Sequence, residues 1–367
     1  MTRLGNARLW VGLLASGCCG AFALADQMGC ASTGDGGSPW VTGTSGDGGA
    51  ITVGSSDGGN PGPGNTVSDS GIGGVVVNQD AGGPEDCPAG AGKFIYVVSD
   101  QNELYTFDPT KVPTATNPTN KPFTDLGALH CTGESTPPAS DSDGVNSMAV
   151  DRQAIAWVNF NDGKIFRVDT TQTSLPCTDT NYDSSQGNFT PQLGMGFATA
   201  SATDHTETLY VSDNAGPGGA GTPGAGKGLG WIDTKTMKMA PLGGWGSSLA
   251  GYNAELSGTG DGQLYGFFTT TPSDLATIDK SSGTGSAVIP LNSVNNSQGG
   301  YAFSFWGGDF WFYTAYPTDT DPDPTTSVTH FVSADGGAGV VMTDIGFTIV
   351  GAGASTCVPT VPPPIAK

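Results

Sequence analysis

The chain has 367 residues, including 59 glycines and 25 prolines, and a formal net charge of −21. This charge argues against nucleic acid as a partner, because phosphate contacts need clustered Lys and Arg. It also disfavours adsorption to anionic lipid headgroups. Solubility outside the cytoplasm is the simplest interpretation of the acidity.

Residues 1–25 have the features of a signal peptide, with two arginines ahead of an apolar run. Residues 15–18 (Ala-Ser-Gly-Cys) resemble a bacterial lipobox that would place lipid on Cys18, whereas residues 23–25 (Ala-Leu-Ala) fit ordinary signal peptidase. We favour lipidation of Cys18, because it leaves six of the seven cysteines, an even number, for pairing. The apolar run is too short to span a bilayer comfortably. We therefore expect an exported protein that is either anchored in the outer membrane by this lipid or free in the periplasm or outside the cell.

Residues 26–86 are expected to form a flexible tether. Gly, Ser, Thr and Asp dominate them, and an Asp-Gly-Gly unit recurs from Asp35, Asp47 and Asp57. Such a composition cannot bury enough apolar surface to offset its backbone entropy. A coil of this length reaches about 40 Å, which would hold a folded domain clear of a surface.

Past residue 90, an apolar strand that ends in aspartate and leads into a polar turn recurs along the chain. The aspartates are Asp108, Asp169, Asp233, Asp279 and, in a weaker copy, Asp335. An Asp at this position can accept hydrogen bonds from backbone N–H groups two or three residues later. We expect it to fix the turn out of each strand.

Each repeat carries further short strands rich in β-branched and aromatic residues. The expected second strands cover residues 94–98, 154–158, 208–211, 263–267 and 310–313, and the expected innermost strands cover residues 147–150, 195–198, 254–257 and 301–304. Four strands per unit at a spacing of roughly 45–65 residues predict an all-β fold, a β-propeller of five four-stranded blades. A β-sandwich is the alternative, but it would leave the recurring aspartate turn unexplained.

The first blade lacks an innermost strand, because the chain enters it with the second strand at residue 94. Residues 346–350 have no unit of their own, so we expect this C-terminal strand to complete the first blade and protect its edge. The predicted propeller covers residues 87–357, and residues 358–367 form a Pro-rich tail.

The cysteines agree with this closure. Cys357 follows the last strand and Cys87 precedes the first, so Cys87–Cys357 is the leading disulfide pairing. Cys131–Cys177 would then join the first two blades. Four cysteines allow three connectivities, so the other pairings stay open.

In this strand pattern, residues 90–357 resemble propellers of the NHL-type and gluconolactonase-like class. The signal–tether–propeller layout is similar to that of tethered envelope lipoproteins of bacteria such as myxobacteria. The gluconolactonase-like resemblance implies a divalent cation held in the central channel by Glu, Asn and Asp side chains. Glu255 is the only Glu on an expected innermost strand, so no ligand set can be carried over.

The sequence contains few residues or motifs that indicate a catalytic or metal-binding site. Residues 87–357 contain no Gly-x-Ser-x-Gly motif. None of the three histidines has a second His or a Cys at metal-ligand spacing, so loop or surface positions are expected for His130, His205 and His330. The acidic residues 141–143 and 319–323 lack the spacing of a calcium loop. Lys227 in the Gly-rich loop of residues 214–229 is followed by Gly228, so the phosphate-loop pattern is incomplete.

An aromatic concentration lies at Trp306, Phe310, Trp311, Phe312 and Tyr313. Packing between blades is the expected role, with sugar stacking as the alternative. We expect a monomeric, tethered binding module for an envelope protein or a glycan, without a cofactor that the sequence requires. Two alternatives stay open, a metal-dependent hydrolase or lactonase that uses the channel with a divalent cation, and a structural protein without a ligand.

Overall fold

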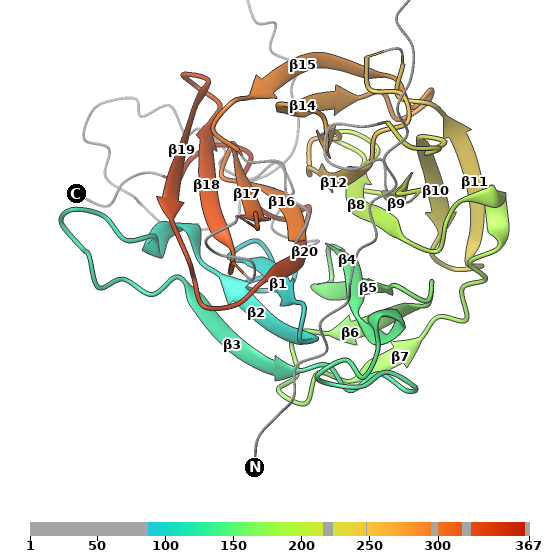
Figure 1. The fold of residues 1–367 in the computed structure, drawn as a ribbon, viewed down its shortest axis with the longest axis horizontal. Helices are drawn as coiled ribbons and strands as arrows, with labels where there is room; N and C mark the ends of the chain where they lie inside the picture. Colours follow the sequence, from blue (N-terminus) through green and yellow to red (C-terminus); the bar gives the residue numbers. More distant parts are fainter. Residues whose placement is uncertain (1–86, 216–222, 247, 295–299, 318–323, 364–367) are drawn as a thin grey trace, which may run out of the picture. The chain divides into compact units, whose positions relative to one another are not determined.

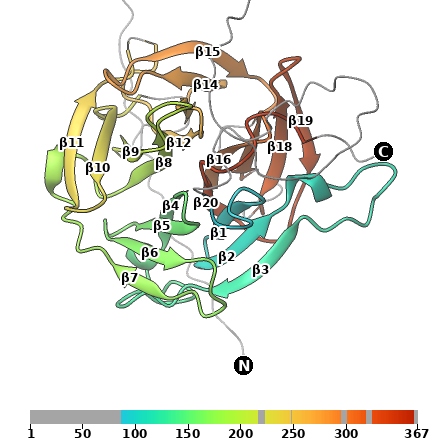
Figure 2. The same ribbon diagram turned by 180° about the vertical axis from the view of Figure 1, so that it is seen from behind.

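The computed structural model describes residues 87–215, 223–246, 248–294, 300–317 and 324–363. Cys18, the predicted signal peptide and the predicted tether lie outside these described residues. Within them, strands form five four-stranded antiparallel sheets arranged in a ring, a five-bladed β-propeller (Figures 1 and 2). No helix in the described part of the chain is long and apolar enough to cross a membrane.

Each blade is a meander of four strands that follow one another from the innermost to the outermost. Blade 1 contains, in this order, β20 (Ile349–Ala354), β1 (Ile95–Ser99), β2 (Glu103–Phe107) and β3 (Phe123–Ala128). Blade 2 contains β4 (Val145–Val150), β5 (Ile155–Phe160), β6 (Ile165–Asp169) and β7 (Cys177–Asp179). Blade 3 contains β8 (Leu193–Thr199), β9 (Glu207–Asp213), β10 (Leu229–Asp233) and β11 (Lys238–Gly243).

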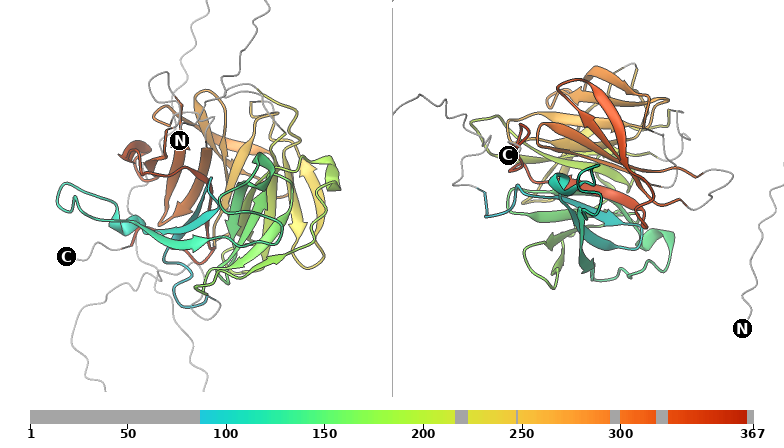
Figure 3. Two further views of the ribbon diagram at one scale, coloured as in Figure 1. Left: turned by 60° about the horizontal axis from the view of Figure 1, so that its bottom comes forward. Right: turned by 90° about the vertical axis from the view of Figure 1, so that its left-hand side faces the viewer.

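Blade 4 contains β12 (Ala254–Gly258), β13 (Leu264–Phe268), β14 (Ser273–Ile278) and β15 (Gly285–Leu291). Blade 5 contains β16 (Gly300–Trp306), β17 (Asp309–Ala315), β18 (Ser327–Val332) and β19 (Gly337–Met342). In such a meander, the turns between the first and second strands of blades 2 to 5, and between the third and fourth strands of every blade, lie on one face of the ring, which we call the turn face. Figure 3 shows the ring from two further directions.

The prediction that the C-terminal strand completes blade 1 is confirmed. β20 pairs antiparallel with β1, from Ile95 opposite Ala354 to Ser99 opposite Ile349. The strand nevertheless begins three residues later than expected and extends to Ala354. Its glycines disfavour a strand by propensity, yet they are needed here, because a Cβ on Gly353 would lie 2.9 Å from the backbone nitrogen of Val150 in β4.

The recurring aspartate forms the turn that the sequence predicts in all five blades. In each one, Oδ1 accepts a hydrogen bond from the backbone N–H two residues later. The donors are Thr110 at 3.1 Å, Thr171 at 3.0 Å, Lys235 at 2.8 Å, Ser281 at 2.8 Å and Gly337 at 2.8 Å. At Asp279, the Ser281 hydroxyl and the amides of Ser282 and Ser281 lower the pKa to about 2.

A second repeated contact joins neighbouring blades. A buried side-chain oxygen near the second or third strand of one blade accepts the first N–H of the innermost strand of the next. The pairs are Asn102 with Val145 at 3.0 Å, Asn159 with Leu193 at 3.0 Å, Asn214 with Ala254 at 3.1 Å, and Thr326 with Ile349 at 2.8 Å. Apolar clusters fill the seams between blades, and the most aromatic of them joins blades 4, 5 and 1.

Candidate ligand pocket between blades 5 and 1

A cavity of about 720 Å³ opens beside the turns of blades 5 and 1, and we call it the seam pocket. Three walls enclose it. One is the β2–β3 loop at Pro109–Thr114, the second is blade 5 with Trp306, Trp311, His330 and Val341, and the third is the tail at Pro362 and Pro363. Figure 1 shows the β2–β3 connection reaching out toward β19 at this seam.

The first wall is built by the repeat aspartate of blade 1. Asp108 is 4% exposed and caps the 3-10 helix η1 (Pro109–Lys111) by accepting the Thr110 N–H. Its other carboxylate oxygen lies 3.3 Å from Nζ of Lys111. A side-chain acceptor at a helix N-cap satisfies an otherwise free amide and sets the direction of the chain. The predicted turn residue therefore orients the loop that borders the pocket.

Strand register builds the second wall. Trp311 in β17 lies directly opposite His330 in β18, and the two rings stack with centroids 4.0 Å apart and an interplanar angle of 6°. His330 Nε2 is 2.9 Å from Oδ2 of Asp309, whose Oδ1 accepts the Ser333 N–H at 2.9 Å. The wall therefore combines an indole face, an imidazole and one carboxylate.

The chain's tail supplies the third wall. The Gly307 N–H donates to the Pro359 carbonyl oxygen at 2.8 Å. A Cβ on Gly308 would lie 3.0 Å from the Thr360 carbonyl oxygen and 3.1 Å from Cδ of Pro362. Gly308 also has a φ of +83°, a conformation that favours glycine. The β16–β17 turn thus packs closely against this segment of the tail.

All five residues of the aromatic concentration belong to the buried cluster that joins blades 4, 5 and 1, which we call the seam core, as expected for packing between blades. Phe312 and Tyr313 are fully buried in the seam core. Trp306 and Trp311 border the pocket, and the Trp306 indole N–H donates to the Gly92 carbonyl oxygen at 3.2 Å. The Trp311 indole N–H is buried and has no hydrogen-bond acceptor among the described residues. Such a group is rare in folded proteins and usually has an unseen partner.

The sequence predicts a loop or surface position for His330. The residue lies inside β18, and its side chain is 25% exposed. Pairing with Trp311 across the strands could not be foreseen, because it depends on register. His130 lies in a loop as expected.

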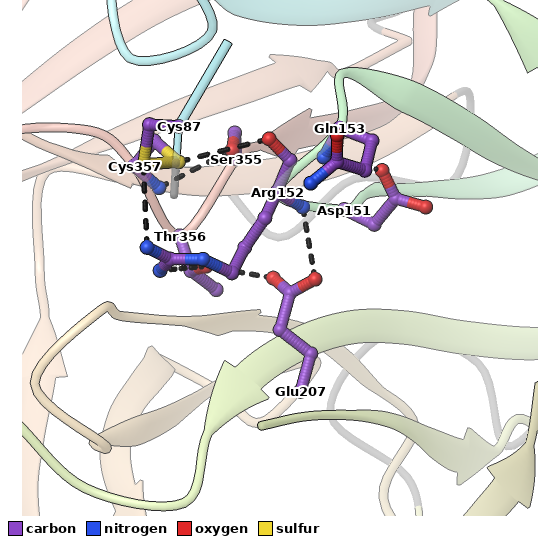
Figure 4. Close-up of a disulfide and its surroundings, with 8 residues drawn as sticks. All are labelled: Cys87, Asp151, Arg152, Gln153, Glu207, Ser355, Thr356 and Cys357. Atoms are coloured by element: carbon purple, nitrogen blue, oxygen red, sulfur yellow. Dashed lines mark hydrogen bonds between the residues drawn. A yellow bond between two sulfur atoms is a disulfide. The ribbon is translucent and has the colours of Figure 1, made fainter. Parts of the chain in front are cut away.

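Both expected disulfides are present. Cys87–Cys357 joins the two ends of blade 1 with a Cα–Cα distance of 6.0 Å, and Cys131–Cys177 links the region after blade 1 to blade 2 with 5.1 Å. Near the first disulfide, on the turn face, lies a polar cluster (Figure 4). Arg152 is 5% exposed, and its guanidinium donates to the Thr356 hydroxyl at 3.2 Å and contacts Sγ of Cys87 at 3.3 Å.

Glu207 joins this cluster from blade 3. Its carboxylate accepts the Arg152 N–H at 2.9 Å and the Thr356 hydroxyl at 2.7 Å (Figure 4). Burial raises the pKa of Glu207 to about 7, although both hydrogen bonds act in the opposite direction. Blades 1, 2 and 3 are thereby connected through one titratable group.

Glu207 is expected to make stability depend on pH. The folded pKa of about 7 exceeds the 4.5 of an exposed glutamate, so the neutral form favours folding. Its contribution is complete below the unfolded pKa and is lost as the pH rises through the folded pKa. Between about pH 5 and pH 8, the free energy of unfolding should fall by about 2 kcal/mol less in Glu207→Gln than in the wild type. Urea unfolding of both proteins at several pH values in this range measures the difference. If the unfolding free energy fell equally with pH in both proteins, Glu207 would not have the raised pKa assigned to it.

A second buried carboxyl group lies among the innermost strands of the propeller. Glu255 lies on the innermost strand β12, as predicted, and is 2% exposed. Burial raises the pKa of its carboxyl group well above the usual value, and Oε2 accepts the Ser147 hydroxyl at 2.6 Å. No group of three or more His, Cys, Asp or Glu that could hold a metal ion occurs in the described part of the chain.

The other candidate sites from the sequence are the acidic residues 141–143 and 319–323 and the Gly-rich loop of residues 214–229. Asp141–Asp143 form a 3-10 turn in which Ser140, Ser135 and Ser142 donate to Asp143 and lower its pKa. The Lys227 N–H donates to Asp213 at 2.9 Å, so this end of the Gly-rich loop is tied to blade 3. Residues 216–222 of that loop and the acidic residues 319–323 lie outside the described residues.

No family model matches the sequence, and no curated protein matches it. Among solved structures, an inactive variant of virginiamycin B lyase from Staphylococcus aureus with quinupristin matches with a TM-score of 0.34 and 11% identity, over 70% of this chain and 71% of that one. A protein of unknown function from Bacteroides thetaiotaomicron matches with a TM-score of 0.37 and 13% identity, over 70% and 63%.

The extracellular domain of a hybrid two-component system from B. thetaiotaomicron matches with a TM-score of 0.33 and 11% identity, over 70% of this chain and 29% of that one. The chain therefore spans less than two thirds of the second and third of these structures. At such TM-scores, the similarities carry no inference about ligand or activity.

Proposed function

We propose that this chain is an exported binding module, held to the cell envelope by a lipid on Cys18 and a flexible tether, and that the seam pocket is its ligand site. The two disulfides support export, because such bonds persist mainly in oxidising compartments. Incorporation of labelled palmitate into the full chain, and its loss in Cys18→Ala, tests the anchor. Label in both proteins, or in neither, would contradict it.

The observation that carries the binding role is the seam pocket itself. Its 720 Å³ lies within the range of small-molecule and side-chain sites, which is about 300–1,000 Å³. Indole, proline and valine side chains line most of it, and the His330–Asp309 pair adds a few polar atoms. Apolar walls with a small number of placed polar groups are typical of binding sites. The hydrolase alternative has the buried Glu255–Ser147 pair in its favour, but in the described part of the chain no group of three or more His, Cys, Asp or Glu stands ready to hold a metal ion.

A neutral apolar dye, Nile red, tests whether the pocket accepts a ligand. We expect saturable binding at one site of the full chain. Val341→Asp should weaken the dye at least tenfold, or about 1.4 kcal/mol, because a charge then enters an apolar wall. Fluorescence titration gives both dissociation constants.

The matched control is Val340→Asp. Val340 is the neighbouring residue in β19, is 50% exposed and does not line the pocket. It should leave dye affinity within about twofold of the wild type, since a surface charge away from the site changes little. Equal weakening by both variants, or no saturable binding at all, would refute the seam pocket as a ligand site.

A further inference from the structure

We infer that the seam pocket recognises an extended, proline-rich peptide. This inference rests on the proposed function and specifies its ligand class. Proline-rich segments adopt a stiff left-handed helix without internal hydrogen bonds, and they dock in grooves lined by aromatic rings. Two features of the pocket favour this class over a sugar.

The first feature is that the pocket rim already carries a proline-rich segment of the chain itself. Residues Val358–Pro363 run over the β16–β17 turn, held by the hydrogen bond from Gly307 to Pro359. Val358 is 2% exposed and belongs to the seam core, whereas Pro362 and Pro363 are exposed and line the pocket. The rings of these prolines therefore pack at the edge of the surface on which a second proline-rich segment would lie.

The second feature is that most polar groups of the walls are already engaged. Asp309 accepts from Ser333 and bonds His330. The Thr110 hydroxyl donates to Asp108, and the Thr114 hydroxyl pairs with Thr116. A sugar carries many hydroxyl groups that need partners when water is removed, and an unpaired polar group costs free energy. Proline side chains impose no such requirement.

The test uses the full chain with Nile red bound and a synthetic peptide of residues 358–367 as competitor. We expect the peptide to displace the dye, and a version with its four prolines changed to alanine to be at least fivefold weaker. Val341→Asp should weaken direct binding of the fluorescent peptide at least tenfold, and Val340→Asp should not. Pro113→Asp, on the β2–β3 loop, is a second variant that alters the opposite wall without touching the seam core.

The outcomes separate the two proposals. If Nile red binds but neither peptide displaces it, the peptide inference fails and the proposed function stands. Displacement by a neutral oligosaccharide such as cellotetraose, without displacement by the peptide, would likewise overturn the inference in favour of a glycan. If Nile red itself does not bind, both proposals fail.

Discussion

Replacing Cys87 and Cys357 by serine is expected to lower the free energy of unfolding by about 5 kcal/mol, from the loop that this disulfide closes. The sequence separation is 270 residues, and a longer closed loop restricts the unfolded chain more strongly. The bond also holds β20 on β1, because blade 1 has no covalent turn between these two strands. Its loss should therefore free one edge of the ring as well as destabilise the whole domain.

The matched control for this prediction is the double serine variant at Cys131 and Cys177. Their separation is 46 residues, and neither end strand of the ring depends on them. We expect a smaller loss, about 4 kcal/mol in the same treatment. Urea unfolding gives the losses, and amide exchange shows whether β20 opens first. A larger loss in the control, or unchanged exchange in β20 after removal of Cys87–Cys357, would refute this account of closure.

Gly194→Ala is expected to destabilise the propeller by more than about 3 kcal/mol, because overpacking against backbone cannot relax through a side chain. A Cβ on Gly194 in β8 would overlap the carbonyl oxygen of Ala254 in the neighbouring strand β12. Gly258 in β12 makes a similar approach to Phe197 in β8. The innermost strands of blades 3 and 4 therefore meet at a distance that only glycine permits.

Gly339→Ala is the control for Gly194→Ala. Gly339 also lies in a strand, β19, and a Cβ there would meet no atom within 4 Å. Since alanine limits the unfolded chain without a clash at this position, we expect a change within about 1 kcal/mol. Thermal and urea unfolding of the two variants measure the contrast. Similar stabilities would show that the inner strands can move apart.

The parts of the fold that could be predicted depend on residues close together in the sequence and on the number of strands in each repeat. The turn at Asp279 needs only a strand, an aspartate and the amides that follow, all contiguous in sequence. The need to complete blade 1 followed from counting strands, and the Cys87–Cys357 pairing followed from that closure. The bounds of β20 did not follow, because its Ile-Val-Gly-Ala-Gly-Ala sequence is a poor strand by propensity and is required by its neighbour β4.

The seam pocket could not be predicted, because its walls come from three distant stretches of chain. The loop after Asp108, the β17–β18 register at Trp311 and His330, and the tail at Pro362 meet only once the ring closes. A partial signal was present in the aromatic concentration. The contacts made by Asn102, Asn159 and Asn214 were also missed, although an Asn in or just after the second strand of three successive blades could have indicated them.

Amide hydrogen exchange on the full chain, with and without saturating Nile red, tests the central claim most directly. The account predicts new protection in the β2–β3 loop around Thr110–Thr114 and in the β16–β17 turn at Gly307. A second cavity, of about 630 Å³, lies beside Asp100, Glu103 and Thr348, residues in or next to the turns that face away from the turn face. Protection confined to those residues, with none in the seam pocket, would contradict the account.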